Sequence, residues 1–177
     1  PEHISAYSLI IEEGTPFAEK KPELPDEEEE RRMYERTKEL LAENGLYRYE
    51  ISNYAKPGFA SRHNLNYWEN GVYLGLGLNS HSAMRINGSW MRFANTERLS
   101  DYIISCNQGI RPLASEPEVI PRAEEMFETV MLGLRKTEGI SEAAFRLRFG
   151  KSIEDIYPEA LKSLATRGWL VRDNGAC

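Results

Sequence analysis

The 177-residue sequence has few cysteines, no long apolar run and no recognisable secretion signal. Its two cysteines, Cys106 and Cys177, lie far apart, so the chain offers neither a disulfide framework nor a cysteine-based metal site. Its apolar runs are all shorter than the roughly 20 residues that a membrane-spanning helix requires. These absences predict a protein of the reducing cytoplasm.

The sequence also lacks an excess of basic charge and the common catalytic motifs. Its 22 Lys and Arg residues are outnumbered by 28 Asp and Glu residues, which argues against a nucleic-acid-binding surface over the whole molecule. It contains no Ser-His-Asp spacing, no HExxH and no P-loop. Gly75 and Gly77 do not form a dinucleotide fingerprint, because Ser80 occupies the position of the third glycine.

What remains is ordinary for a globular protein, with 41% hydrophobic and 28% charged residues. The chain begins at Pro1, directly before a strand-like stretch. It ends on a strand-like stretch at 169–171 and a turn-like stretch at 173–175, with no returning strand. We therefore expect it to be a piece of a longer protein.

The first part of the chain predicts an α/β structure. Residues 3–11 and 46–54 are strand-like, and between them Asp26 caps a helix that Gly45 ends. Strand, helix, strand in this order predicts a βαβ unit with a parallel sheet. Residues 72–78 predict another strand, whose glycines allow a backbone or a ligand to approach closely. Gly88 then marks the turn of a hairpin.

The second part predicts a small helical domain. Asn95 or Thr96 is expected to cap a helix, and the three prolines of 109–121 predict a linker, which gives domains at 1–110 and 111–177. An amphipathic helix follows, with apolar residues at Ile120, Ala123, Met126, Phe127, Val130, Met131 and Leu134. Ser141 and Ser152 are expected to cap further helices. Helices followed by a strand at 169–171 are typical of a winged-helix-like domain.

The polar and aromatic stretch at 47–81 predicts a binding site. His63 lies in the sequence HNLNYW, where a neutral imidazole is a good ligand for iron and the neighbouring aromatic rings suit a flat macrocycle. The alternative is a histidine that is hydrogen-bonded to the backbone in a loop, with Trp68 filling the end of a barrel. His81 follows the predicted strand at 72–78, at the end where α/β barrels carry their active sites.

These residues resemble a known family. YRYEISNYAKPGFASRHNLNYW (residues 47–68), followed by YLGLGLNSHS (73–82), resembles the HemW-type radical-SAM haem chaperones, relatives of the oxygen-independent coproporphyrinogen III oxidases. HISAYSLIIEEGTPF (3–17) resembles a late barrel strand of that family, and the segment from about Arg111 resembles its C-terminal domain.

The resemblance implies a partial (β/α) barrel with a helical, winged-helix-like C-terminal domain. It implies a 4Fe–4S cluster and S-adenosylmethionine in the full-length protein, with Ile10 and His81 as the matching S-adenosylmethionine contacts. It further implies haem binding and delivery to haem-requiring recipient proteins, whether soluble or membrane-associated. The matching haem-binding residues are His63, the candidate iron ligand, with Asn64, Tyr67 and Trp68.

The sequence departs from the family in lacking its CxxxCxxC cluster motif. We therefore expect this chain alone neither to hold the cluster nor to perform radical chemistry, and whether the longer protein is an enzyme stays open. One alternative is the oxidase, which removes two carboxyl groups from coproporphyrinogen III; HNLNYW favours the chaperone. Another is a winged-helix nucleic-acid module at 113–177. Its predicted reading helix offers the positive charges of Lys162 and Arg167 against the negative charge of Glu159, and the wider chain is acidic, so no nucleic-acid partner is expected.

Overall fold

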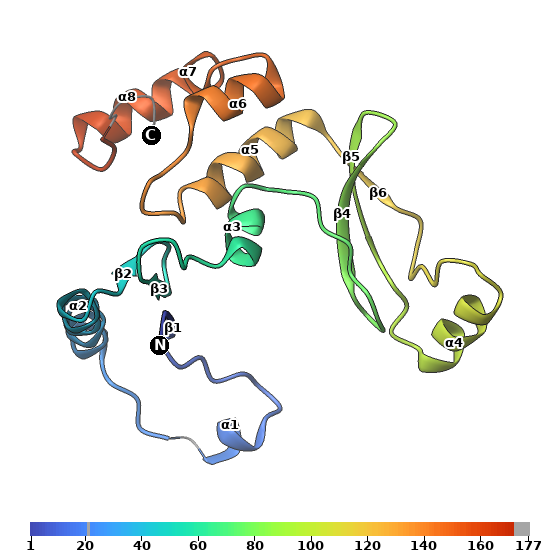
Figure 1. Ribbon diagram of the computed structural model, residues 1–177, viewed down its shortest axis with the longest axis horizontal. Coiled ribbons are helices and arrows are strands. Elements are labelled where there is room, and N and C mark those ends of the chain that lie inside the picture. Colours follow the sequence, from blue (N-terminus) through green and yellow to red (C-terminus); the bar gives the residue numbers. More distant parts are fainter. Residues whose placement is uncertain (21, 172–177) are drawn as a thin grey trace. The chain divides into compact units, whose positions relative to one another are not determined.

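The structure, a computed structural model, describes residues 1–20 and 22–171 (Figure 1). By its internal contacts the chain divides into two compact units, Pro1–Ser61 and Arg62–Cys177. The division at residue 110 that the prolines suggest stays a prediction.

The first unit is a small antiparallel sheet with helices. It contains β1 (His3–Ser5), α1 (Pro16–Lys20), α2 (Glu27–Glu43), β2 (Tyr47–Arg48) and β3 (Asn53–Ala55). Strand β3 lies between β1 and β2 and is antiparallel to both.

The predicted parallel βαβ unit is therefore wrong. Residues 46–54 form a hairpin where a single strand was expected, and only His3–Ser5 of residues 3–11 is a strand. The reason lies in Glu50, whose buried carboxylate accepts hydrogen bonds from the Ser52 N–H at 3.1 Å and from the Asn53 side-chain amide. These short-range bonds turn the chain back on itself before it can continue as a strand.

The helix predicted after Asp26 is confirmed as α2. The Asp26 carboxylate accepts a hydrogen bond of 2.8 Å from the backbone N–H of Glu29. Gly45 follows the end of the helix at a φ of +75°, a conformation that glycine adopts without steric cost.

The second unit contains an antiparallel sheet of β4 (His81–Ile86), β5 (Ser89–Ala94) and β6 (Glu118–Ile120), in that order. The predicted hairpin is confirmed: Asn87 and Gly88 both have positive φ, as the tight turn between β4 and β5 requires. The strand predicted at 72–78 is wrong, since this segment pairs only through a single bridge from Tyr73 to Ala83. Gly77, at a φ of +107°, takes the backbone out of the strand conformation.

Six helices of the described residues complete the second unit: α3 (Arg62–Trp68), α4 (Leu99–Asn107), α5 (Arg122–Gly133), α6 (Glu142–Phe149), α7 (Ile153–Ile156) and α8 (Pro158–Thr166). The predicted caps Ser141 and Ser152 are confirmed. The predicted cap of α4 is wrong, because Arg98 occupies that position and the Asn95 amide donates to the carbonyl of Gly77 instead. Residues 169–171 are not in a strand, and the turn-like stretch at 173–175 lies outside the described residues.

The core of the second unit has two apolar clusters. One is built by Ile140, Phe145, Phe149 and Ile153, and the other by Ala83, Trp90 and Ile120. The predicted apolar face of α5 is only partly correct. Met126 and Val130 pack on the first cluster, but Phe127, Met131 and Leu134 are exposed, and Ile120 belongs to β6. The buried side of α5 carries Glu125, Glu128 and Thr129 instead.

Candidate functional site

The four predicted haem-binding residues, His63, Asn64, Tyr67 and Trp68, lie together on α3. The alternative in which His63 lies in a loop is wrong, and the helix decides how the side chains of HNLNYW are presented. Residues four apart on a helix lie one above the other, so His63 and Tyr67 share a face. The imidazole of His63 is exposed, whereas the other three side chains are half-buried.

A row of aromatic rings supports His63. The Tyr67 ring contacts the imidazole edge-on, with ring centroids 4.9 Å apart, and also contacts Tyr73 at 4.8 Å. Burial raises the pKa of the Tyr73 phenol, so this end of the row stays neutral. In the part of the chain that the structure describes, His63 makes this ring contact and no hydrogen bond, so its ring nitrogens are free to bind a ligand.

Trp68 faces a different environment from His63. The guanidinium of Arg135 lies over its indole, 4.5 Å from the ring centroid. Just beyond the helix, Asn70 adopts a φ of +49° and donates a 3.1 Å hydrogen bond to the hydroxyl of Thr129 on α5. Arg148 of α6 donates to the backbone carbonyls of Glu69 and Asn70, at 3.2 and 2.8 Å. The C-terminal end of α3 is thus fixed to both α5 and α6.

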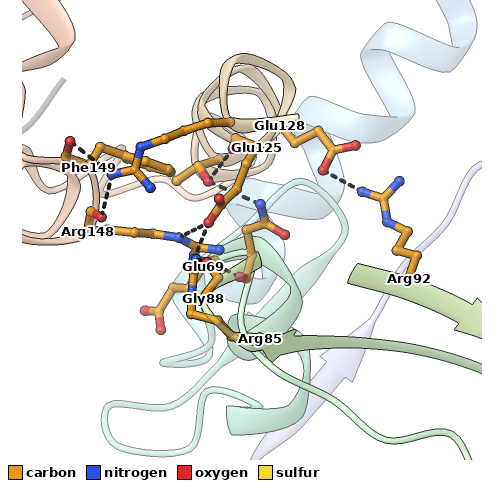
Figure 2. Close-up of polar contacts among 11 residues, drawn as sticks. Glu69, Arg85, Gly88, Arg92, Glu125, Glu128, Arg148 and Phe149 are labelled. Atoms are coloured by element: carbon orange, nitrogen blue, oxygen red, sulfur yellow. Dashed lines mark hydrogen bonds and ion pairs between the residues drawn. The ribbon is translucent and has the colours of Figure 1, made fainter. Parts of the chain in front are cut away.

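The buried glutamates of α5 join the same assembly. Figure 2 shows the carboxylate of Glu125 between Arg85 of β4 and Arg148 of α6, with which it forms ion pairs. Glu128 pairs separately with Arg92 of β5. Burial alone would lower the pKa of Arg92. The hydrogen bond and charge of the Glu128 carboxylate have a larger effect in the opposite direction, so the pKa of Arg92 is raised above its usual range. These pairs hold the hairpin, α5 and α6 together.

The sequence analysis did not identify these arginine–glutamate pairs. The available signal was Glu125 and Glu128, three residues apart and therefore on one face of a helix, within the predicted amphipathic segment. Their partners lie 23 to 40 residues away in sequence, so helical periodicity alone does not reveal them.

The two predicted S-adenosylmethionine contacts belong to different units, so their proximity stays a prediction. Ile10 is 79% exposed in the first unit. Nearby, residues 6–9 and α2 line a cavity of about 400 Å³, with Tyr7, Met33 and Tyr34 in its wall. His81 is exposed at the start of β4 in the second unit, where it pairs with Ala94.

The described residues show no group of three His, Cys, Asp or Glu side chains placed to hold a metal ion. A 4Fe–4S cluster takes cysteine thiolates, as a rule four, and the whole sequence has two cysteines, of which Cys106 is a free, exposed thiol. The residues present therefore do not fit such a cluster. Over the same described part of the chain, we found no helix with the length and apolar character needed to cross a membrane.

Comparison with known proteins confirms the resemblance inferred from the sequence. Residues 120–176 match the family described as HemN C-terminal domain. The chain is 37% identical to the heme chaperone HemW of Bacillus subtilis (strain 168), over 99% of this chain and 46% of that protein. It is 33% identical to the heme chaperone HemW of Escherichia coli (strain K12), over 96% of this chain and 43% of that protein. The chain thus spans about half the length of the curated relatives it matches.

A solved structure shows the same fold. Coproporphyrinogen III oxidase (HemN) from Escherichia coli, described as a radical SAM enzyme, superposes with a TM-score of 0.68 at 16% identity. The match covers 95% of this chain and 41% of that one. The predicted α/β fold class is confirmed by this likeness, which at such low identity concerns the fold alone.

Proposed function

We propose that this chain is part of a chaperone that binds haem and delivers it to haem-requiring proteins. Residues 120–176 match the HemN C-terminal domain, and the chain is similar to HemW haem chaperones over nearly its whole length. The observation that carries the proposal is the exposed imidazole of His63, which contacts the ring of Tyr67 on the same helix within the aligned region. Haem is the cargo of such a protein.

Four residues of α3 have roles in this proposal. A ring nitrogen of His63 binds the haem iron, because a neutral imidazole offers a lone pair and this one has no hydrogen bond to give up in the described structure. Tyr67 holds the imidazole through its edge contact. Asn64 and Trp68, both half-buried on the same helix, offer polar and apolar contact area to the macrocycle, with Trp68 at the end of the helix away from His63.

The other family cofactors are assigned to the longer protein. Since the two cysteines of this chain do not fit a 4Fe–4S cluster, we propose that residues outside the chain hold the cluster and most of the S-adenosylmethionine. Ile10 and His81 are the proposed contacts from this chain. We place the protein in the cytoplasm and expect haem-requiring recipients, soluble or membrane-associated, and no nucleic-acid partner.

The proposal is tested by titrating the 177-residue chain with haem. The wild type is expected to give a saturable Soret band, and His63→Ala to shift that band and weaken haem binding about tenfold or more, because it loses the iron ligand. His3→Gln, which removes a histidine that bonds to Tyr49 in the first unit, is the matched control and should behave as the wild type. An unchanged spectrum and affinity in His63→Ala would exclude His63 as a ligand.

The alternative function is that of a coproporphyrinogen III oxidase, the related enzyme that the sequence resemblance leaves open. The two hypotheses differ in the ligand that stays bound. The oxidase converts a porphyrinogen and has no need of a haem complex that depends on His63, whereas a chaperone requires one. The 37% and 33% identities to HemW, set against 16% for the HemN structure, favour the chaperone.

A further inference from the structure

A second pocket lies within the second unit, at the end of α3 and against α5 and α6. Its volume is about 300 Å³, and its wall includes Trp68, Lys136, Phe145 and Arg148. Ligand pockets in proteins range from about 300 to 1,000 Å³, so this one suits a small ligand or one end of a larger one. The proposed haem-iron ligand, His63, does not line it.

Lys136 supplies a buried positive charge to this pocket. Its side chain is only 9% exposed, although a buried ammonium group requires close acceptors. Its two ion pairs, with Glu69 and Glu138, both measure 3.7 Å from nitrogen to oxygen, beyond the usual 2.7–3.2 Å of a hydrogen bond. Both glutamates are well solvated, with side chains 61% and 75% exposed. The ammonium therefore has room for a closer anionic acceptor.

Two further donors of the pocket wall are unsatisfied. The indole N–H of Trp68 and the Nη2 group of Arg148 are buried without a hydrogen-bond partner in the described part of the chain. The remaining nitrogens of Arg148 are used by Glu125 and by the carbonyls at the end of α3. An indole N–H and a guanidinium can only donate, so the matching ligand group is one that only accepts, as a carboxylate does.

Part of the pocket lining is apolar. It includes Gly133, Ile140, Ala144 and Phe145. Gly133 closes it tightly, since a Cβ atom at that position would lie 2.7 Å from Cγ1 of Ile140. Apolar lining residues together with these donors fit a short hydrocarbon stem that ends in an anion.

We propose that this pocket binds an alkyl carboxylate, supplied by a propionate side chain of haem. The assignment of this carboxylate to haem rests on the proposed function. Trp68 follows His63 by five residues on the same helix, a rise of about 7.5 Å at 1.5 Å per residue. One helix thus carries the iron ligand at its start and a wall of the carboxylate pocket at its end.

Binding of the carboxylate is tested with sodium propionate and the ¹⁵N-labelled chain, without haem. The indole N–H resonance of Trp68 is expected to shift saturably in the wild type. Lys136→Met, which keeps the length of the side chain and removes its charge, should weaken propionate binding about tenfold or more, as expected for loss of a charge-assisted hydrogen bond. Lys162→Met on α8 is the matched control and should bind as the wild type does. If Lys136→Met fails to fold, Trp68→Phe is the second variant. It replaces the indole and its N–H by a smaller ring and should weaken propionate binding, which is then followed by the backbone N–H resonance of Gly133 in the pocket wall.

The source of the carboxylate is tested by comparing haem with haem dimethyl ester. The wild type should bind haem more tightly than the ester, and Lys136→Met should lose that preference. Absence of a saturable propionate shift in the folded wild type, or equal binding by Lys136→Met, would overturn the pocket whether or not haem binds. A propionate shift with equal affinities for haem and its ester would support the pocket and overturn haem as the source. Loss of haem binding in His63→Ala with an intact propionate shift separates the two sites.

Discussion

Arg148 donates a 2.9 Å hydrogen bond from its Nε to the carboxylate of Glu125, a side chain that is 3% exposed. The same arginine donates through Nη1 to the two carbonyls that follow α3, and the same carboxylate also accepts from Arg85. The pair therefore connects the helix of the proposed haem site with α5, α6 and the β4–β5 hairpin (Figure 2). The second unit owes much of its assembly to these charges, since its apolar clusters are small.

Glu125→Gln should lower the free energy of unfolding by about 2–3 kcal/mol, because Arg148 stays largely buried after its charge partner is lost. Urea unfolding followed by circular dichroism measures this. The matched control is Glu159→Gln in the first turn of α8, which should change stability by less than about 0.5 kcal/mol. If both variants unfold at the wild-type urea concentration, the pair does not stabilise the unit.

Gly75→Ala should destabilise the chain by about 1–3 kcal/mol through overpacking. A Cβ atom there would lie 2.2 Å from the backbone carbonyl oxygen of His81, and backbone gives way less easily than the end of a side chain. The neighbouring substitution Leu76→Ala removes a side chain that is 84% exposed and should have almost no effect. Equal thermal midpoints for the two variants would contradict the close approach.

Gly75 also shows which features the sequence predicts correctly. A glycine that admits another backbone was expected at 72–78, and the carbonyl of His81 confirms it, although the strand itself does not form. The helix caps at Asp26, Ser141 and Ser152 were predicted correctly because the residues that form each of them lie within three positions.

The features that the sequence did not predict depend on distant partners or on buried polar groups. The hairpin at 47–55 forms because Glu50 is buried and bonded, which no alternation of apolar residues indicates. The polar face of α5 depends on Arg85 and Arg92, on strands 36 to 40 residues away. The resemblance identified the four residues of the candidate haem site. It did not predict that they lie on a helix, where His63 contacts Tyr67.

Lowering the pH should weaken the start of α7. Hydrogen bonds from the Ser152 side chain and backbone hold the pKa of Asp155 below its ordinary value. Because the folded pKa is the lower one, the stabilisation is complete above the unfolded value of about 3.9 and is lost as the pH falls through the folded pKa. The stability difference between the wild type and Asp155→Asn, measured by urea unfolding, should therefore shrink between pH 5 and pH 3. A difference that stays constant over that range would rule out this linkage.

The position of His63 for iron should depend on the ring of Tyr67 and not on its hydroxyl. The Tyr67 ring meets the His63 imidazole edge to face, with an interplanar angle of 84°, and also contacts the ring of Tyr73. Tyr67→Phe keeps both contacts and should bind haem with the wild-type affinity and Soret maximum.

Tyr67→Leu removes the ring, so the exposed imidazole of His63 gains rotational freedom that it must lose again on binding iron. Haem affinity should then fall by about three- to tenfold, which corresponds to the roughly 0.5–1.5 kcal/mol of an aromatic pair. The Soret maximum should stay at its wild-type wavelength, because the iron ligand is unchanged. A structural loss of α3 would instead lower helicity and affect haem and propionate binding together, so circular dichroism and the propionate titration separate the two causes. Equal haem affinities for the Phe and Leu variants would show that the ring row does not position the histidine.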